Sequence, residues 1–274
     1  MKVTGSTRLA AVIGDPIRHS RSPAIHNAAF AAAGLDWVFV AFEVPRGSGS
    51  AAVKAVHSLG LGGMSVTMPH KQDAAWACDE LTPEAIALGA VNAIVPVERG
   101  RTHGASTDGE GFLRSVRDQG IDPGVVSSLV LGAGGAARAI TLALGQVGSE
   151  VTVAARRKDA AESAAGLVRG ADAALLSDCD VRAFDLVVNA TPLGMQGEDP
   201  PIDVNRLNSR QFVVDTVYHP LETPLLAAAR AHGVPCVNGL GMLVHQAALA
   251  FEMWTGVEAP LDAMHAAAIA EPSS

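Results

Sequence analysis

The feature that most constrains this sequence is a glycine-rich turn between a short apolar run and an alanine-rich segment. Residues 128–131 are predicted to form a buried strand and residues 136–147 a helix, and the turn between them fits the pattern G-x-G-x-x-A. Its glycines allow a tight bend and a close approach of the backbone to a pyrophosphate, which the helix N-terminus would bind. The sequence therefore predicts a dinucleotide site that contains Gly132, Ala133, Gly134, Gly135 and Ala136.

The order of the other predicted strands and helices indicates an α/β protein. Ahead of the glycine-rich turn, apolar runs alternate with alanine-rich segments, which is typical of a parallel sheet covered by helices. The predicted strands there are residues 9–13, 37–44 and 63–67, and the predicted helices are residues 22–33 and 50–59. The alternation restarts near residue 125 as a second, doubly wound unit of the Rossmann type.

Two changes of pattern set the expected domain boundaries. A glycine-rich stretch and a connecting helix at residues 112–119 separate the two alternating regions. Beyond residue 238 the sequence changes to Gly-Leu-Gly and two further helices, which we expect to return to the first domain. We predict one α/β domain of residues 1–110 with 239–274, and a Rossmann-type domain of residues 111–238.

Three consecutive cations follow the next predicted strand of the doubly wound unit. An NAD-binding fold would end this strand with Asp or Glu, whereas here Arg156, Arg157 and Lys158 follow it. A guanidinium can stack on adenine and bind a 2′-phosphate with forked hydrogen bonds, so the cations favour NADP, with Arg156 as the main ligand. The alternative is a solvated basic helix start. The spacing of Asp159 to Glu162 predicts that Asp159 is the N-cap of the next helix.

Composition and charge disfavour several classes of function. The net charge of −8 argues against a nucleic-acid partner, because phosphate binding needs concentrated Lys and Arg. Cys78, Cys179 and Cys236 stand far apart without metal-ligand spacing, which indicates a reduced compartment and no metal site. We see no leader pattern and no apolar run near the roughly 20 residues that cross a bilayer. We therefore expect a cytoplasmic protein without a membrane partner.

Polar residues also cluster at predicted turns outside the dinucleotide unit, as a pocket at strand ends would require. The clusters are residues 20–23, 65–71, 91–93 and 107–109. Each has a plain structural explanation when taken singly: Ser22 as a helix cap, Asn92 as a turn residue, and Lys71 as a solvated charge.

Taken together, these motifs resemble those of the shikimate dehydrogenase family over nearly the whole chain. The matching motifs are H-S-x-S-P at residues 19–23, V-T-x-P-x-K at 66–71, A-V-N at 90–92, T-D-x-x-G at 107–111, and N-G-L-G-M-L-x-x-Q-A at 238–247, together with the glycine-rich turn. The resemblance implies reversible reduction of 3-dehydroshikimate to shikimate by NADPH, on the chorismate route to aromatic amino acids.

The resemblance also implies a role for individual residues. Lys71 and Asp108 would form the catalytic pair. The substrate carboxylate would be held by Ser20 and Ser22 with Tyr218 nearby, and the ring hydroxyls by Thr67, Asn92, Asp108 and Gln246. Further cofactor contacts would come from Thr191, Gly239 and Met242.

The chemistry of carbonyl reduction is consistent with this catalytic pair. Hydride addition to a carbonyl carbon leaves negative charge on the oxygen, which Lys71 can stabilise and protonate while Asp108 orients the ammonium and a substrate hydroxyl.

Other functions stay open at this point. Ser65 and Ser106 stand where the family commonly has Asn, so a paralogue acting on quinate or an aminated ring acid is an alternative. The pair Ser20 and Ser22 favours shikimate over quinate. A protein of another class, which senses NADP without catalysis, would be expected to lack the Lys–Asp pair that is present here. A methylenetetrahydrofolate dehydrogenase would share the outline, but its folate-site motif is not found. We expect a monomer or a homodimer.

Overall fold

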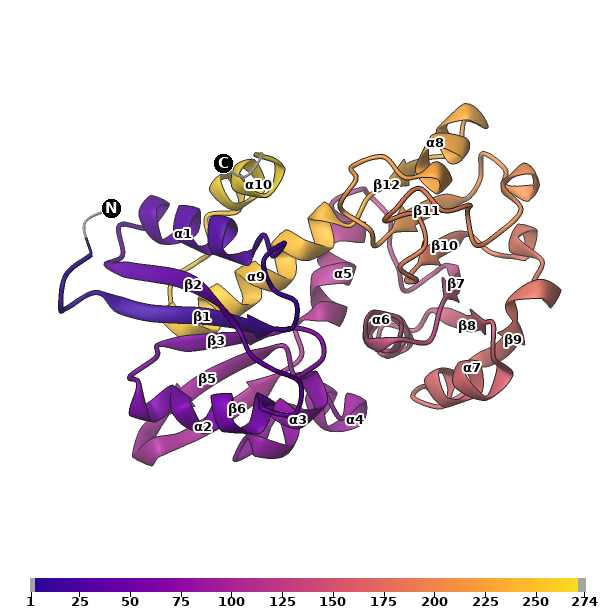
Figure 1. Cartoon of the computed structure of the whole chain (residues 1–274). Helices are drawn as coiled ribbons and strands as arrows, with labels where there is room; N and C mark the ends of the chain where they lie inside the picture. Colours follow the sequence, from indigo (N-terminus) through magenta and orange to yellow (C-terminus); the bar gives the residue numbers. More distant parts are fainter. Residues whose placement is uncertain (1–2, 271–274) are drawn as a thin grey trace. The chain divides into compact units, whose positions relative to one another are not determined.

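The computed structural model describes residues 3–270, which form two compact units (Figure 1). The first unit contains the described residues up to Thr107 and again from Val244, and the second unit is Asp108–Leu243. Each unit is built around its own six-stranded sheet. This arrangement confirms the predicted α/β class with a Rossmann-type second unit.

The first unit alternates strands and helices through most of its length. Its strands are β1 (Arg8–Gly14), β2 (Trp37–Glu43), β3 (Gly63–Val66), β4 (Glu80–Leu81), β5 (Ala93–Val97) and β6 (Arg101–Ala105). Its helices are α1 (Ser22–Ala32), α2 (Gly49–Ser58), α3 (Lys71–Ala77), α4 (Pro83–Leu88) and α10 (Leu261–Ile269), with the part of α9 (Leu240–Thr255) that begins at Val244.

The sheet of the first unit is mixed: the predicted parallel pairing is confirmed for β1, β2 and β3, whereas β5 departs from it. Its strand order is β2-β1-β3-β5-β6-β4, and β5 runs antiparallel to both of its neighbours. The physical reason is the connection between β5 and β6, a single turn at Glu98–Gly100 in which Arg99 has a φ of 61°. A connection this short can join only antiparallel strands.

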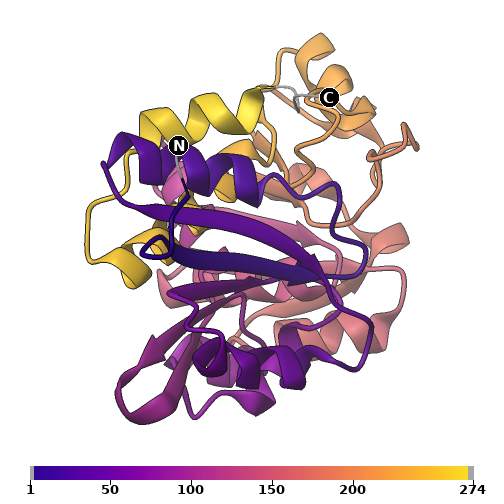
Figure 2. The ribbon, with the colours of Figure 1, turned by 60° about the vertical axis from the view of Figure 1, so that its left-hand side comes forward.

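Two layers of helices cover this first sheet. Figures 1 and 2 show α1 beside α10, and α2 beside α3 in a separate layer. On the α1 side the ring of His26 stacks on Phe39, with centroids 4.4 Å apart, and also contacts Trp254. The indole Nε1 of Trp254 donates to the carbonyl of Ile94 at 3.0 Å. The C-terminal part of α9 is therefore packed into the core of the first unit.

The second unit is a doubly wound parallel sheet. Its strands are β7 (Ser127–Leu131), β8 (Glu150–Ala155), β9 (Asp172–Leu175), β10 (Leu186–Asn189), β11 (Phe212–Asp215) and β12 (Cys236–Val237). Its helices are α5 (Asp108–Arg117), α6 (Gly135–Gln146), α7 (Lys158–Ala165), α8 (Pro224–Ala231) and the start of α9. Strand β9 was not predicted from the sequence, because its run D-A-A-L is short and lies only partly buried at the sheet edge.

The strand order of the second sheet defines where a ligand would bind. The order is β12-β11-β10-β7-β8-β9, and all neighbouring pairs are parallel. From β7 the chain first proceeds to β8 on one side and later returns to β10 on the other. The carboxyl ends of β7 and β10 therefore flank the topological switch point, where open α/β sheets bind ligands.

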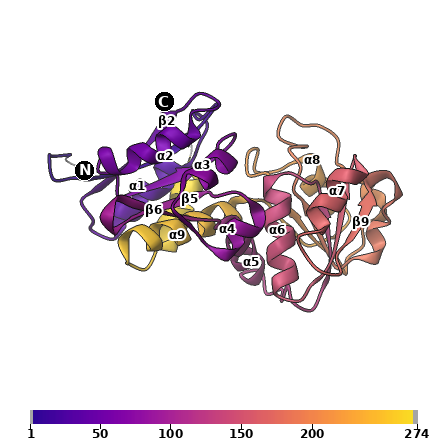
Figure 3. The same ribbon diagram turned by 90° about the horizontal axis from the view of Figure 1, so that it is seen from below.

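Helix α5 begins four residues earlier than the connecting helix expected from the sequence. Its first residue is Asp108, whose acidic side chain is favoured in the first turn by the helix dipole. Gly109 follows, and a Cβ there would lie 2.8 Å from both the carbonyl oxygen of Ala139 and the Cβ of Ala143. Helices α5 and α6 pack side by side at this contact, as Figures 1 and 3 show.

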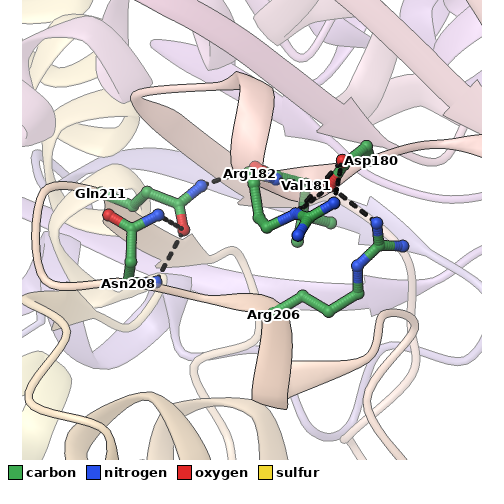
Figure 4. A network of polar contacts seen from close by, with 6 residues as sticks. All are labelled: Asp180, Val181, Arg182, Arg206, Asn208 and Gln211. Atoms are coloured by element: carbon green, nitrogen blue, oxygen red, sulfur yellow. Dashed lines mark hydrogen bonds and ion pairs between the residues drawn. The ribbon is translucent and has the colours of Figure 1, made fainter.

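Two loops at the amino-terminal edge of the second sheet are held by a polar network (Figure 4). Asp180 forms ion pairs with Arg182 at 2.7 Å and Arg206 at 2.9 Å. The buried amide of Gln211 donates from Nε2 to the carbonyls of Val181 at 2.6 Å and Phe184 at 2.8 Å. The network fastens the segment before β10 to the segment before β11.

Candidate active site

A cluster of polar side chains lies beyond the strand ends of the first unit. The Nδ2 of Asn92 donates to Oγ1 of Thr107 at 2.9 Å and to Oε1 of Gln246 at 3.3 Å. The backbone N–H of Thr107 donates to Oδ1 of Asn92 at 2.8 Å, and its hydroxyl lies 3.0 Å from the carbonyl oxygen of Gln246. Asn92 and Thr107 are buried, whereas Gln246 is half-buried. The cluster joins three residues that are distant in the sequence.

Lys71 is tied to this cluster through the backbone. It is the first residue of α3, and its carbonyl accepts a hydrogen bond from the N–H of Val91 at 3.0 Å. The next residue is Asn92, whose carbonyl accepts from the N–H of Val66 at 2.8 Å. Thr67 follows Val66 at the end of β3. The structure thus brings Thr67, Lys71, Asn92 and Gln246 to one edge of the first sheet.

Ser20 lies in the loop that follows β1, and Ser22 begins helix α1 at the end of that loop. Strand β1 is paired in parallel with β3. The N–H of Ser22 donates to Oγ of Ser20 at 3.3 Å. Ser22 is the first residue of α1, the N-cap is Arg21, and no described side chain caps this helix. The alternative explanation, in which Ser22 serves only as the cap of α1, is therefore wrong. Both serines lie beyond the carboxyl end of β1, at the same sheet edge as Thr67.

The glycine-rich turn of the second unit has the geometry of a phosphate site. Gly132 has a φ of +109°, and a Cβ there would approach the carbonyl oxygen of Ala190 to 3.0 Å and Cγ2 of Thr191 to 3.1 Å. At Gly134 and Gly135, by contrast, an added Cβ would meet no described atom within 4 Å. Packing within the described chain therefore does not require glycine at these two positions. A ligand that approaches their backbone closely would require it, because a side chain would occupy the same space.

The start of helix α6 supports the same conclusion. Its N-cap is Gly134, and within the described chain no side chain caps this end and its first turn contains no acidic residue. Uncapped N–H groups and the positive dipole end are suited to bind a pyrophosphate. The residues present at Gly132–Ala136 therefore fit an NADP pyrophosphate.

The three cations after β8 differ in their surroundings. Arg157 lies 3.4 Å from Asp159, and Lys158 lies 3.9 Å from Glu162. The Arg156 side chain is exposed and takes part in none of the side-chain hydrogen bonds or ion pairs described for residues 3–270. The N-cap of α7 is Arg157, so the expectation that Asp159 caps this helix is wrong: α7 begins at Lys158, and Asp159 lies in its first turn. Arg156 is the cation whose side chain no described protein group engages.

The remaining predicted cofactor residues have different roles in the fold. Thr191 lies directly beside the glycine-rich turn, as the approach of its Cγ2 to Gly132 shows. A Cβ at Gly239 would come within 2.0 Å of the carbonyl oxygen of Thr216, so packing by itself requires this glycine. Met242 is partly buried against the core of the second unit. Packing is therefore sufficient to explain Gly239 and Met242, and their contact with a cofactor stays a prediction.

Asp108 and Tyr218 belong to the second unit, whereas Lys71 belongs to the first. Asp108 is half-buried in the first turn of α5. Tyr218 is half-buried in the segment between β11 and α8. The pairing of Lys71 with Asp108 stays a prediction.

Four polar residues beside these candidate sites were not predicted from the sequence. They are Thr107 in the first unit and Asn189, Thr223 and Asp215 in the second. Asn189 and Asp215 are each the last residue of a buried apolar strand, and this placement at strand ends was the available signal. Burial raises the pKa of the Asp215 carboxyl above its ordinary value.

Metal and membrane features are absent from the described part of the chain. Within residues 3–270 no group of three His, Cys, Asp or Glu side chains could hold a metal ion. None of the described helices is long and apolar enough to cross a bilayer.

The fold and the site define a class of protein. A parallel sheet with a ligand-ready glycine turn at its switch point is a Rossmann-type dinucleotide-binding unit, and here it is joined to an α/β unit with a polar cluster beside a lysine. Residues 12–94 match the shikimate dehydrogenase substrate binding domain, and residues 239–269 match the shikimate 5′-dehydrogenase C-terminal domain.

Comparison over the full length identifies the family. The chain is 42% identical to the NADP(+) shikimate dehydrogenase of Methanopyrus kandleri, covering 98% of this chain and 97% of that one. The structure matches shikimate 5-dehydrogenase from Thermus thermophilus in complex with NADP(H) and shikimate, with a TM-score of 0.89, 37% identity and coverage of 95% and 98%. The chain belongs to the shikimate dehydrogenase family, which confirms the resemblance seen in the sequence.

A quinate dehydrogenase shares the same fold. The structure of the enzyme from Corynebacterium glutamicum in complex with NAD matches with a TM-score of 0.89 and 33% identity, covering 95% of this chain and 98% of that one. The fold alone therefore does not distinguish between ring substrates or between the two nicotinamide cofactors.

Proposed function

We propose that the protein catalyses the reversible reduction of 3-dehydroshikimate to shikimate with NADPH, on the route through chorismate to the aromatic amino acids. The observation that carries the proposal is the cluster of Asn92, Thr107 and Gln246 at the strand edge that also holds Lys71, in a chain that matches shikimate dehydrogenases over nearly its full length. The cluster offers hydrogen-bond donors and acceptors of the kind that ring hydroxyls require.

Lys71 and Asp108 are the catalytic residues in this proposal. NADPH, when bound, supplies the hydride. The ammonium of Lys71 stabilises the negative charge that develops on the carbonyl oxygen and then protonates that oxygen. The carboxylate of Asp108 orients the ammonium and a neighbouring substrate hydroxyl. In the direction of shikimate oxidation, Lys71 accepts the proton from the reacting hydroxyl.

Substrate binding is assigned to residues of both units. Ser20 and Ser22 hold the ring carboxylate with their hydroxyls, with Tyr218 nearby. Thr67, Asn92, Asp108 and Gln246 hold the ring hydroxyls. The loop that carries the two serines is anchored by Arg21, whose guanidinium donates to the carbonyl of Ala268 at 3.0 Å. This anchoring restricts the positions that the two hydroxyls can take.

Cofactor binding is assigned to the second unit. The N–H groups at Gly132–Ala136 bind the pyrophosphate, and Arg156 binds the 2′-phosphate with help from Arg157 and Lys158. Thr191, Gly239 and Met242 complete the site on the nicotinamide side. An available guanidinium at Arg156, together with paired cations beside it, favours NADP over NAD.

The proposal is tested by following absorbance of the reduced nicotinamide with shikimate and with quinate, each with NADP and with NAD. Selective turnover of shikimate with NADP is the expected result. Preference for quinate or NAD would assign the protein to the activity of its quinate dehydrogenase relative. Turnover of neither acid by folded protein would favour an aminated ring substrate or a sensor of NADP.

We also propose domain roles, a location and an assembly for the protein. Residues 1–110 with 239–274 bind the substrate and residues 111–238 bind NADP. The protein acts in the cytoplasm, where reduced cysteines are maintained. It exists as a monomer or a homodimer, which sedimentation equilibrium of the purified protein would distinguish.

A further inference from the structure

A buried carboxylate with neutral partners lies at the carboxyl end of β11, next to β10, which flanks the switch point of the second sheet. Asp215 ends β11 and is fully buried. Its Oδ1 accepts from Nδ2 of Asn189 at 2.9 Å and from the N–H of Val217 at 3.1 Å, and its Oδ2 accepts from the hydroxyl of Thr223 at 2.6 Å. Among the described residues, none of the ion pairs includes Asp215.

Burial of the Asp215 carboxylate without a counterion is unfavourable for the free energy of folding. A buried carboxylate without a counterion loses solvation that three neutral donors only partly replace. Burial accordingly raises the pKa of the Asp215 carboxyl. A group of this kind is expected where the positions of its partners matter more than the stability it contributes.

The first arm of the network shapes the loop after β10. Oδ1 of Asn189 accepts from the N–H of Thr191 at 3.1 Å and from its hydroxyl at 2.7 Å, while Nδ2 donates to the carbonyl of Leu193 at 3.1 Å as well as to Asp215. Each donor and acceptor position of the Asn189 amide is thus used. Bonded to Asp215 on one side, Asn189 fixes the path of residues 190–193 on the other.

The loop after β10 contacts the glycine-rich turn at its start and Thr223 farther along. The carbonyl of Ala190 and the methyl of Thr191 are the atoms that crowd the missing Cβ of Gly132 in the glycine-rich turn. Farther along, the missing Cβ of Gly194 would lie 3.1 Å from Cβ of Thr223, whose hydroxyl binds Asp215. A movement of the loop would therefore be transmitted directly to the glycine-rich turn.

The second arm of the network fixes the segment before Tyr218. The N–H of Val217 donates to Asp215, and the carbonyl of Val217 accepts from the N–H of Gly239 at 3.0 Å. Thr216 is held by its N–H, which donates to the carbonyl of Asn189 at 2.9 Å. Tyr218 is the next residue along the chain. One carboxylate thus sets the start of the segment that carries Tyr218 and, through Asn189, the loop that carries Thr191.

We propose that Asp215 is a positioning residue for hydride transfer, which joins the Thr191 loop to the Tyr218 segment through Asn189 and Val217. This inference rests on the proposed function, because it assigns Thr191 to the cofactor and Tyr218 to the substrate. Asp215 itself touches neither. Its acceptor oxygens hold Thr191 and Tyr218 in their positions relative to each other. Loss of these oxygens therefore misplaces the reacting groups, although the cofactor and substrate can still bind.

Two variants at this position separate its acceptor oxygens from its charge. Asp215→Ala removes both acceptors and releases both arms. Asp215→Asn keeps one acceptor oxygen, which can still receive Asn189 and Val217 while the new amide group donates to Thr223. We expect kcat to fall about tenfold or more in Asp215→Ala, because small misplacements of reacting groups are costly. We expect Asp215→Asn to restore most of kcat, and the Kd for NADPH to change less than about threefold in either variant.

Asp185 provides a matched control at the opposite edge of the same sheet. It precedes β10 and accepts from Ser127 through the backbone N–H at 3.0 Å and the hydroxyl at 2.7 Å. Asp185→Ala should lower the melting temperature and leave kcat unchanged. The proposal is overturned if Asp215→Ala keeps wild-type kcat, or if Asp185→Ala lowers kcat as much.

Amide hydrogen exchange gives a readout that does not depend on turnover, and its first test needs only the wild-type protein. In the wild-type protein the N–H groups of Thr191 and Val217 should be protected although both lie outside the sheet ladder. Exchange of these two amides at unprotected rates would overturn the proposal. In the variants, protection should be lost in Asp215→Ala and kept in Asp215→Asn. If the wild-type protein oxidises neither shikimate nor quinate, the proposed function fails, and this exchange pattern still decides whether Asp215 holds the two segments.

Discussion

The side-chain amide of Asn92 donates to Oε1 of Gln246 at 3.3 Å, although the two residues are 154 positions apart. Thr107 closes the same cluster from a third part of the chain. The bond holds the part of α9 that lies in the first unit against the residue before β5, and Gln246 is half-buried there. The contact of Gln246 with a ring hydroxyl is part of the proposed function.

Gln246→Ala should weaken shikimate binding without unfolding the protein. The variant loses one hydrogen bond to Asn92 and one to the ring, so we expect KM for shikimate to rise about tenfold, with a smaller change in kcat. Steady-state kinetics with saturating NADP measure this effect. Gln72→Ala, on the exposed side of α3, is the control and should behave as wild type. An unchanged KM in Gln246→Ala would remove Gln246 from the substrate site.

Lys71→Ala should lose turnover while retaining ligand binding. Removing the group that protonates the oxygen should lower kcat by about 10² to 10⁴-fold. Equilibrium binding of shikimate, measured by calorimetry, should remain within about tenfold of wild type. Lys54→Ala, an exposed lysine in α2, is the matched control. Wild-type turnover in folded Lys71→Ala would exclude the assigned role.

Arg156→Ala should change cofactor preference. Loss of a charge-assisted contact to the 2′-phosphate should lower kcat/KM for NADP by about 10 to 100-fold and leave kcat/KM for NAD almost unchanged. Arg157→Ala should have a smaller effect, because Arg157 already pairs with Asp159. Equal losses with both cofactors would show that Arg156 does not read the 2′-phosphate.

His26 should make stability depend on pH in the acid range. Burial lowers the pKa of His26 to about 3, whereas an unfolded histidine titrates near about 6.5. Between these two values the unfolded chain binds a proton that the folded chain does not, so stability falls as the pH falls. The loss should approach about 4 kcal/mol near pH 3.

The contribution of His26 is isolated by comparing pH profiles of the free energy of unfolding for wild type and His26→Leu. The variant should lose less stability than wild type between about pH 6.5 and about pH 4. His232→Leu, at an exposed position after α8, should keep the wild-type profile. Parallel profiles for wild type and His26→Leu would contradict the buried neutral state of His26.

Gln211→Ala should destabilise the second unit without affecting the site. The variant leaves the carbonyls of the buried Val181 and the half-buried Phe184 without their amide partner, at a cost of about 2 kcal/mol. Chemical denaturation measures this loss. Arg206→Ala breaks only an exposed ion pair in the same network and should shift the midpoint much less. Similar midpoints for the two variants would contradict the role of the Gln211 amide.

Much of the fold was predictable because local patterns specify it. The turn at residues 132–137 between an apolar strand and an alanine-rich helix identified the Rossmann-type unit, and three cations after β8 indicated NADP. The parallel pairing predicted for the first sheet is confirmed for β1, β2 and β3, but it does not extend to β5 and β6, because the tight turn between them forces antiparallel pairing. Two elements, α4 and β9, were not predicted, because runs of 6 and 4 residues are too short to show a periodic pattern.

The sequence by itself determined the residue types at the candidate site, since Lys71, Asn92 and Gln246 stand in motifs whose order is specific. Only the tertiary structure decided which groups meet. The bonds from Asn92 to Gln246 and from Asn189 to Asp215 join residues far apart in the chain, at positions set by strand order and sheet register. Local propensity carries no information on such pairs, because their proximity arises from packing of whole elements. For the same reason, only the structure showed that the backbone of Thr216 packs against Gly239 and leaves no room for a side chain there. It also showed that the space beside Gly134 and Gly135 is open.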